Sequence, residues 1–367
     1  MNDKYLTIKR LTKVVGGGLT PRMVRHYHQI GLLPPARRSP SNYRLYTEEE
    51  VRRLRQIVAL KEQGFQLEHI RKLLEANPQP GKSEELLSKL QQQYRSIIEK
   101  LIKLRQTASA LERILGRDIS CQMVQSEAIA KLPLLDLEET GIDELWDALD
   151  AVADSHPEEF EESLQYILPD LSDRSEIEAH LLSKLALASG DITIVHFARV
   201  GKGAIAAARD ALKSGCQIVA DVPAIAAAFD STRLAHLGCA VKVLIDNPHI
   251  ASAAEAEREF PWRSPRAQWS QLAPGCIVVV GYAPSVLMSV CSAIESGQLQ
   301  PALAIAMPIG FSHAPAAKRR LRAARIPFIT VDGTIGGGLL AAVALNALAE
   351  STIEKPDCHC YLNSNLD

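Results

Sequence analysis

No apolar stretch in this 367-residue chain reaches the roughly 18 residues that a membrane-spanning helix needs. The chain also opens without a signal peptide, which would combine a basic start with an apolar run. Its seven cysteines are scattered and odd in number, which is not the pattern of a disulfide framework. We therefore expect a cytoplasmic protein with reduced thiols and no membrane partner.

Two nucleotide-binding motifs are also missing. The sequence has no G-x-x-x-x-G-K-[ST] loop, and no G-x-G-x-x-G turn that follows a strand and precedes an acidic partner. These absences argue against ATP or NAD as a ligand. Function must be sought in an uneven charge distribution, a long heptad-like segment, a glycine-rich second half and a short Cys-His-Cys tail.

The net charge of −2 hides a strong asymmetry along the chain. Residues 1–80 hold 15 Lys and Arg residues against 7 Asp and Glu residues, so this segment carries +8 and the remainder about −10. A basic module joined to an acidic body is typical of a nucleic-acid-binding domain attached to a second function. The chain length allows two or three domains.

The basic segment predicts two short helices joined by a turn, followed by an arginine-rich wing. Apolar residues recur at helical spacing from Leu6 to Val15. Thr20-Pro21 is typical of an N-cap and a first helical residue, and Gly31 of a C-cap glycine. Polar side chains on the second helix and the wing suit phosphate and base-edge contacts. The expected DNA-binding residues are Thr20, Arg22, Arg25, His26, Tyr27, Arg37, Arg38, Tyr43 and Arg44.

Three motifs in this region resemble the winged helix-turn-helix of MerR-type transcription regulators. They are R-x-Y-x-x-x-G-L-L (Arg25 to Leu33), R-x-Y-x-x-x-x-V (Arg44 to Val51) and G-F-x-L-x-x-I (Gly64 to Ile70). The resemblance covers residues 1–77 and implies double-stranded promoter DNA and RNA polymerase as partners. An unrelated basic helical domain is the alternative.

Residues 83–116 predict one long helix. Apolar residues recur at steps of three and four for more than four heptads, from Leu87 to Leu115, and Gly116 ends the pattern. A lone helix of this kind needs a partner, so we interpret it as the dimerisation helix of a homodimer, which the resemblance also implies. Packing against the chain's own second domain is the alternative.

Residues 157–352 alternate short apolar runs with Ala-rich segments, which predicts an α/β domain with a mainly parallel sheet. The expected fold class is therefore multidomain: an all-α winged helix-turn-helix with a long dimerisation helix, then this α/β domain, joined by a linker over residues 117–156. The expected strands are Ile192–Val195, Ile218–Ala220, Val241–Ile245, Ile277–Val280, Ala302–Met307 and Phe328–Val331, and Ala204–Lys213 is an expected helix.

Three Gly- and Pro-marked turns follow expected strands of this domain. In parallel sheets, ligands bind beyond the carboxyl ends of the strands, and free backbone N–H groups at helix N-termini attract carboxylates or phosphates. The turns therefore predict a pocket for an anionic ligand. Its expected residues are Gly281, Ala283, Pro284, Ser285, Pro308, Gly310, Lys318, Gly336 and Gly337.

The same turns resemble precorrin-8X methylmutase, the precorrin isomerase of cobalamin synthesis, through the G-x-A-P-[TS]-x-L and M-P-[VI]-G-F pieces. This resemblance implies a polycarboxylated corrinoid ligand. Leu187 stands where the family has its catalytic histidine, and leucine cannot exchange a proton. Asp332 stands where the family has a cation. His196 is close in sequence and is the alternative catalytic histidine, although it falls in a segment that resembles a strand. The departures predict a domain that keeps the fold but is not an enzyme.

The C-terminal tail, residues 353–367, contains Cys358-His359-Cys360. Sulfur and nitrogen donors suit a late first-row ion such as cobalt, nickel or zinc. Adjacent residues cannot easily enclose an ion, so Cys121, which follows the long helix, is the candidate further ligand. A tail that binds nothing and an inert Cys121 are the alternatives. The other four cysteines lie in apolar contexts that favour packing roles.

Together, these parts resemble cobalt-responsive members of the MerR family. The resemblance implies Co(II) as effector, a corrinoid intermediate as a second ligand, and activation of a cobalt-efflux gene by distortion of promoter DNA. One rival is an active methylmutase that carries an autoregulatory DNA-binding domain. Another is a regulator that senses only the corrinoid, with no role for the tail.

Overall fold

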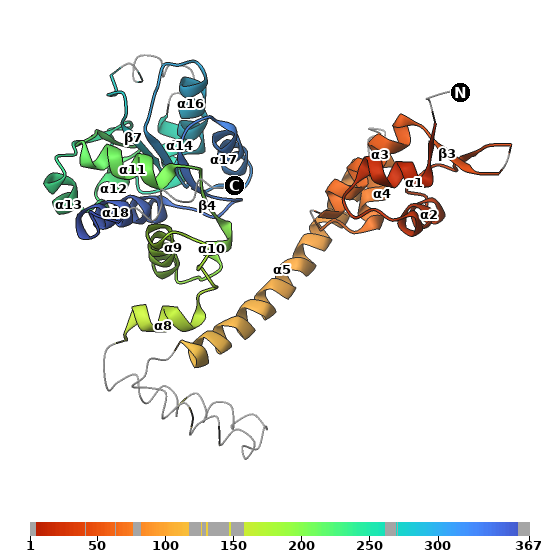
Figure 1. Cartoon of the computed structure of the whole chain (residues 1–367), viewed down its shortest axis with the longest axis horizontal. Helices are drawn as coiled ribbons and strands as arrows, with labels where there is room; N and C mark the ends of the chain where they lie inside the picture. The colour runs from red at the N-terminus through yellow and green to blue at the C-terminus, as the bar shows by residue number, and fades with distance from the viewer. Residues whose placement is uncertain are drawn as a thin grey trace. The chain divides into compact units, whose positions relative to one another are not determined.

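The computed structural model describes residues 5–40, 42–62, 64–75, 82–116, 158–260 and 271–358, with the single residues Ser126, Ala130, Asp147 and Trp269. By its internal contacts the chain divides into two compact units, Met1–Leu111 and Glu112–Asp367 (Figure 1). Among the described helices, none is long and apolar enough to cross a membrane.

The first unit is a small helical domain with a three-stranded antiparallel sheet and one long helix. Its strands lie in the order β1-β3-β2. The chain runs through β1 (Leu6–Thr7), α1 (Ile8–Val15), α2 (Pro21–Gln29), β2 (Arg37–Arg38), β3 (Arg44–Tyr46), α3 (Glu48–Glu62), α4 (Leu67–Glu75) and α5 (Lys82–Leu115).

Local sequence signals set the helix starts of this unit. The Thr20 side chain accepts a 3.2 Å hydrogen bond from the Met23 N–H, which caps α2 as expected. At α3 the Thr47 N–H donates to the Glu50 carboxylate at 2.7 Å, which is one half of a capping box. Both helices then pack into one core with Leu11 and Leu54, which are fully buried.

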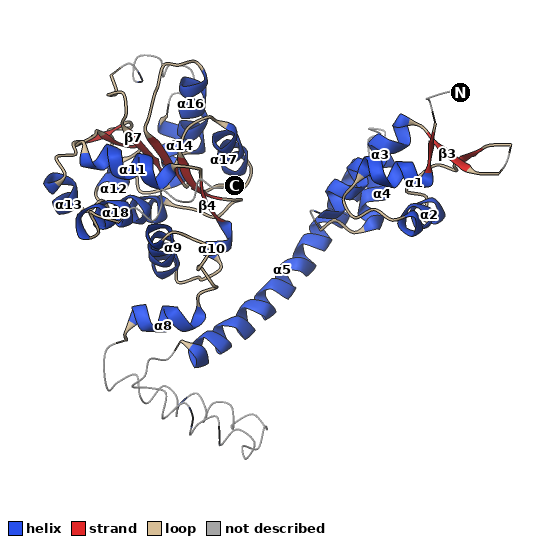
Figure 2. Ribbon diagram, in the orientation of Figure 1, coloured by secondary structure: helices blue, strands red, loops and turns tan. Residues whose placement is uncertain are grey.

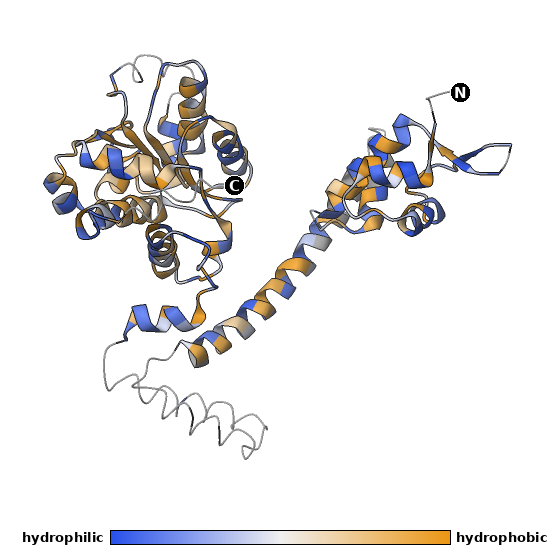
Figure 3. Ribbon diagram, viewed as in Figure 1, coloured by the Kyte–Doolittle hydropathy of each residue, from blue (hydrophilic) through white to orange (hydrophobic). Residues whose placement is uncertain are grey.

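Helix α5 matches the expected long helix over Lys82–Leu115. Its apolar residues alternate with polar ones along the ribbon in Figure 3. The heptad side chains remain exposed: Leu101 is 58% accessible and Leu104 is 68% accessible. This apolar seam of α5 also includes Tyr94, Ile97, Leu111 and Leu115, all at least half exposed.

The second unit is built on a six-stranded sheet covered by helices on both faces (Figure 2). Its described elements are α8 (Phe160–Ile167), α9 (Glu176–Ser189), α10 (Ile194–Phe197), β4 (Ala198–Val200), α11 (Ala204–Lys213), β5 (Ile218–Ala220), α12 (Pro223–Ala226), α13 (Ser231–His236), β6 (Val241–Val243), α14 (Ala253–Glu259), β7 (Ile277–Val280), α16 (Pro284–Glu295), β8 (Leu303–Ala306), α17 (His313–Ala323), β9 (Phe328–Val331) and α18 (Gly338–Glu354).

The strand order is β4-β9-β8-β7-β5-β6. Strand β4 runs antiparallel to β9, and every other neighbouring pair is parallel. The carboxyl ends of β5, β7, β8 and β9 therefore meet at one edge of the sheet. The expected mainly parallel α/β domain is confirmed.

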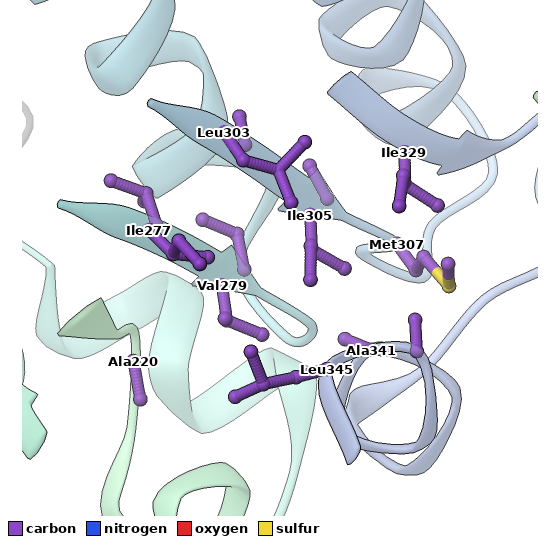
Figure 4. Close-up of a cluster of buried hydrophobic side chains, with 14 of the residues drawn as sticks. Ala220, Ile277, Val279, Leu303, Ile305, Met307, Ile329, Ala341 and Leu345 are labelled. Atoms are coloured by element: carbon purple, nitrogen blue, oxygen red, sulfur yellow. The ribbon is translucent and has the colours of Figure 1, made fainter. Parts of the chain in front are cut away.

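The core of this unit lies between the sheet and α18. In Figure 4, side chains of β7 and β8 such as Val279 and Ile305 point toward Ala341 and Leu345 of α18, and all of these are fully buried. Helices α11, α12 and α9 contact α18, whereas α16 and α17 contact each other on the opposite face (Figure 1). Because both faces are covered, the central strands are continuous apolar runs rather than alternating ones.

One expected strand is wrong. Residues 192–193 form a turn and residues 194–195 begin α10, so the first strand of the sheet is β4 at Ala198–Val200. A short apolar run fits a buried helical turn as well as a strand, because periodicity cannot distinguish the two over four residues.

Candidate DNA-binding face, ligand edge and metal tail

The expected DNA-binding residues form an exposed basic surface on the first unit. Arg22, Arg25 and His26 lie on the outer side of α2. The wing is a β2–β3 hairpin in which Arg37 pairs with Leu45 and Arg38 with Arg44. The face as a whole consists of Thr20, Arg22, Arg25, His26, Arg37, Arg38, Tyr43 and Arg44, all exposed.

Tyr27 does not belong to this face. Its side chain is 1% exposed and lies in the core of the first unit with Leu11 and Leu54. Its hydroxyl has no hydrogen-bond partner among the described residues, and burial raises its pKa. Tyr27 follows two exposed residues on α2, but the helical turn carries it round to the buried side, so the sequence-based assignment is corrected.

The three glycine-rich turns of the second unit lie together at the carboxyl edge of the sheet. A Cβ added to Gly281 would lie 2.6 Å from the Gly338 Cα, and one on Gly336 would lie 2.3 Å from the Met307 carbonyl oxygen. A Cβ on Gly310 would lie 3.4 Å from Pro284 Cγ. Glycine is therefore needed at positions 281 and 336, because a side chain there would collide with the backbone of a neighbouring turn.

The backbone N–H groups of the first turn are already bound within the chain. The Oδ2 atom of Asp221, at the end of β5, accepts hydrogen bonds from the N–H groups of Gly281, Tyr282 and Ala283 at 3.2, 2.8 and 3.2 Å. The Glu257 carboxylate accepts from both the N–H and the hydroxyl of Ser285, at 3.0 and 2.7 Å. Two acids thus occupy the positions that we expected an anionic ligand to take.

Asp221 is fully buried, and its Oδ1 atom has no partner among the described residues. Burial raises the pKa of this carboxyl to about 6, against the opposing effect of the three N–H donors. The sequence analysis missed Asp221. Its position directly after a buried apolar strand was the available signal, because ligand-edge residues follow strand ends.

Lys318, on α17, is buried as well. Its ammonium donates to the Gly333 carbonyl at 3.2 Å and to the Ile335 carbonyl at 2.5 Å. Burial lowers the pKa of this amine to about 8. Lys318 thus holds the turn that precedes α18, because its ammonium group binds two backbone carbonyls of that turn.

Asp332 lies between two cations at the same edge. Its carboxylate accepts from Arg199 Nε and from Arg322 Nη1, both at 2.8 Å. The negative charge of Asp332 is therefore balanced by these two neighbouring guanidinium groups. Nearby apolar side chains are exposed, including Phe311 at 92% and Leu339 at 58%.

Leu187 and His196 line different cavities. Leu187, 41% exposed on α9, lines a cavity of about 230 Å³ with His180 and Lys184. His196, at the end of α10, lines another of about 200 Å³ with Arg174 and other residues. The imidazole that shares a cavity with Leu187 is therefore that of His180, which the sequence analysis did not single out. Its Nε2 atom lies 3.6 Å from Glu350 Oε1.

A buried arginine fixes the start of the tail. Arg209, on α11, is 0% exposed and donates to the Ser351 carbonyl at 2.6 Å and to the Lys355 carbonyl at 2.7 Å. These carbonyls end α18, so the guanidinium caps that helix. Cys358 lies three residues after Lys355, and its thiol is 3.9 Å from Glu176 Oε2 on α9.

Of the four expected metal ligands, the structure describes Cys358 alone. Cys121, His359 and Cys360 lie outside the described residues. Within the described part of the chain, no three His, Cys, Asp or Glu side chains are gathered closely enough to hold a metal ion.

Comparison with known families divides the chain in the same way. Residues 160–351 match the family model of precorrin-8X methylmutase, and residues 7–77 match that of the MerR HTH family regulatory proteins. The fusion of a MerR-type DNA-binding domain to a methylmutase-like domain is confirmed.

Similar proteins are found for each part. A precorrin-8X methylmutase of Sinorhizobium sp is 33% identical over 184 residues, which cover 49% of this chain and 86% of that protein. The heavy metal-dependent transcription regulator 1 of Rhizobium meliloti is 38% identical over 69 residues, 19% of this chain and 46% of that protein. The crystal structure of precorrin-8x methyl mutase from Thermus thermophilus is 30% identical, covers 49% of this chain and 88% of its own, and has a TM-score of 0.44.

The expectation that this protein is not an enzyme is contradicted by these matches. It rested on single positions, Leu187 and Asp332, whereas the likeness to an enzyme family extends over residues 160–351. The charge of Asp332 is also balanced in the structure, because Arg199 and Arg322 flank it. The chain belongs to the precorrin-8X methylmutase family and carries a MerR-type DNA-binding domain at its N-terminus.

Proposed function

We propose that this protein is a cobalt-responsive transcription regulator that binds promoter DNA as a homodimer. The observation that carries the proposal is the exposed basic face of α2 and the wing on the same chain as a corrinoid-enzyme domain. Arginines at such a face neutralise phosphates and position the protein on the duplex. A dimer would present two copies of this face to two half-sites.

The apolar seam of α5 supports the dimer. Leu101 and Leu104 are exposed on the single chain, although full burial of such a side chain stabilises by about 1.5–3 kcal/mol. Pairing of α5 with α5 of a second copy would bury the seam on both helices. A two-fold pair of helices also matches the symmetry of a two-half-site operator.

The tail supports the response to Co(II). Cysteine and histidine suit cobalt, and Arg209 holds the chain just before Cys358. His359, Cys360 and Cys121 would supply the other donors. The relative named a heavy metal-dependent regulator is consistent with metal control in proteins that share this DNA-binding domain.

The carboxyl edge of the sheet supports a corrinoid as a second ligand. A tetrapyrrole is a flat, largely apolar ring with carboxylates at its rim, and Ile309, Phe311 and Leu339 expose apolar surface at that edge. Arg199 and Arg322 supply positive charge beside it. Turns at strand ends are where α/β sheets bind ligands.

Activation would proceed by deformation of the promoter. Bending or untwisting DNA over a site of this size requires on the order of 1–6 kcal/mol. The effector must therefore bind the activating conformer more tightly than the other by a comparable free energy. RNA polymerase would then transcribe a gene for cobalt efflux from the deformed promoter.

The first test is a titration of the reduced protein with Co(II), followed by UV–visible absorbance. We expect a thiolate-to-cobalt charge-transfer band that is lost in Cys358→Ser/Cys360→Ser and weakened in Cys121→Ser. The buried Cys291→Ser is the matched control and should retain the band. Identical spectra for the parent and the tail variant would overturn the role of the tail.

A second test separates the two effectors. Transcription from a promoter that the protein binds is measured in vitro with Co(II), with a precorrin-8 substrate, and with both. Co(II) alone should increase transcription, and the tail variant should not respond. A response to the tetrapyrrole alone would make the second domain the sensor. Turnover of the same substrate would show whether the domain also catalyses methyl transfer.

A further inference from the structure

Three cysteines enter the sheet through the same local motif. Each follows a glycine with positive φ: Gly215 (+69°), Gly238 (+71°) and Gly275 (+76°). The cysteines after them precede β5, β6 and β7, which are neighbours in the order β7-β5-β6. The thiols thus gather at the amino edge of the sheet, opposite the ligand edge.

The strand register brings two of them side by side. Ile218 of β5 pairs with Val241 of β6, and the Ile218 N–H donates to the Ala240 carbonyl at 2.8 Å. Extending this register by two residues places Cys216 beside Cys239. Neighbouring strands lie about 4.8 Å apart, within the roughly 4.4–6.8 Å Cα separation that a disulfide requires.

The backbones approach closely just before these cysteines. A Cβ added to Gly215 would lie 3.2 Å from the Gly238 carbonyl oxygen. The Cys239 thiol points toward the end of α11, where it lies 3.7 Å from the Leu212 carbonyl oxygen. The thiols of Cys216 and Cys239 lie close enough for each to shift the pKa of the other.

Access differs between the thiols. Cys239 is 8% exposed and Cys276 is 0% exposed, whereas Cys216 is partly exposed. The pair therefore combines a partly exposed cysteine with a buried cysteine beside it. In the β5–β7 register, Cys276 lies beside Gln217 and not beside Cys216. It is therefore displaced by one residue along the strand from the Cys216–Cys239 pair.

We propose that Cys216 and Cys239 form an oxidisable dithiol that low-molecular-weight disulfides convert to an internal disulfide. The Cys216 thiolate attacks one sulfur of the oxidant and expels one thiol, which leaves a mixed disulfide on Cys216. The Cys239 sulfur then attacks the Cys216 sulfur and expels the second thiol. The protein loses two electrons and two protons, and the oxidant becomes two thiols.

The internal disulfide should form slowly at neutral pH and faster at alkaline pH. Burial raises the pKa of Cys216 to about 12, so little thiolate is present near pH 7. The bond would join the α11–β5 connection to the α13–β6 connection. Asp221 follows the other end of β5 and binds the turn after β7. The disulfide would therefore restrict the motion of the strand that positions this turn.

The test uses the full-length reduced protein incubated with oxidised glutathione, then blocked with N-ethylmaleimide and digested with trypsin. Cleavage after Lys213, Arg233 and Lys242 places Cys216 and Cys239 in different peptides. We expect a disulfide-linked pair of these peptides, formed about a hundredfold faster at pH 9 than at pH 7 because the thiolate fraction rises tenfold per pH unit below the pKa.

Two serine variants distinguish the proposed disulfide from other thiol reactions. Cys239→Ser should retain a glutathione adduct on Cys216, whereas Cys276→Ser should still form the linked pair. The oxidised parent should also unfold about 5 °C higher than the reduced parent, since cross-links restrict the unfolded chain. A persistent glutathione adduct in the parent, or a link from Cys216 to another cysteine, would overturn the proposal.

Discussion

The Oδ2 atom of Asp221 accepts a 2.8 Å hydrogen bond from the N–H of Tyr282, and through this contact β5 holds the turn that follows β7. The carboxylate is fully buried, and two further N–H groups of the turn share the same oxygen. A carboxyl group inside the protein is therefore part of the architecture of the carboxyl edge of the sheet.

Replacing Asp221 by Asn should change how stability depends on pH. Because the pKa rises from 3.8 unfolded to about 6 folded, the folded protein keeps a proton that the unfolded chain has released between these values. Stability from this group is present below about pH 4 and is lost as the pH rises through 6. Urea unfolding should show the parent losing about 3 kcal/mol relative to Asp221→Asn between pH 4 and 7. Parallel curves for the two proteins would contradict this linkage.

Arg22→Ala and Arg25→Ala should weaken DNA binding in a salt-dependent way. Each arginine is exposed on α2, so loss of one phosphate contact should reduce the slope of log affinity against log salt by about 1. Tyr27→Phe is the control, because the Tyr27 hydroxyl is buried and has no partner among the described residues. Fluorescence anisotropy at several salt concentrations measures all three, and an equal loss for Tyr27→Phe would mean that the face is wrongly assigned.

Leu104→Glu should disrupt a dimer that forms through α5. A glutamate at a 68% exposed seam position does not affect the single chain, but it would bury a charge in each half of the interface. We expect a loss of about 3 kcal/mol, roughly a hundredfold in the dissociation constant. Lys103→Glu, one position away on the exposed surface, should leave the dimer intact. Sedimentation velocity separates the cases, and equal behaviour of both variants would remove the seam from the interface.

Arg209→Met should destabilise the second unit by about 3 kcal/mol, because the end of α18 loses two charge-assisted hydrogen bonds in a buried site. Lys213→Met is the control, since its ammonium reaches the Pro356 carbonyl at 3.3 Å from an exposed position. That change should stay within about 0.5 kcal/mol. Urea unfolding measures both, and the role assigned to Arg209 fails if the two variants are equally stable.

Local sequence signals predicted much of the fold. The bounds of α11, β5, β7 and β9 agree with the expected segments residue for residue, because apolar runs bounded by glycine and proline leave little freedom in a sheet covered on both faces. The caps at Thr20 and Thr47 could also be predicted, because each is a hydrogen bond between a backbone N–H and a side chain three residues away.

Other features depended on contacts between distant segments. Tyr27 and Arg25 both belong to one motif, and only packing shows that the tyrosine lies in the core. The turn after β7 was expected to offer its N–H groups to a ligand, but Asp221 lies 60 residues away from Gly281 in sequence and binds them first. Asp332 was counted as a departure from the family because it replaces a cation, but the fold places Arg199 and Arg322 beside it.

The sequence by itself thus determined which segments form helices and strands, which end of the chain is basic, and which family motifs it carries. These properties depend on neighbours a few residues apart and on composition. Only the tertiary structure decided which side chains are exposed, which donors are already bound and which thiols meet. Those outcomes depend on desolvation and on hydrogen bonds between residues that only the fold brings together.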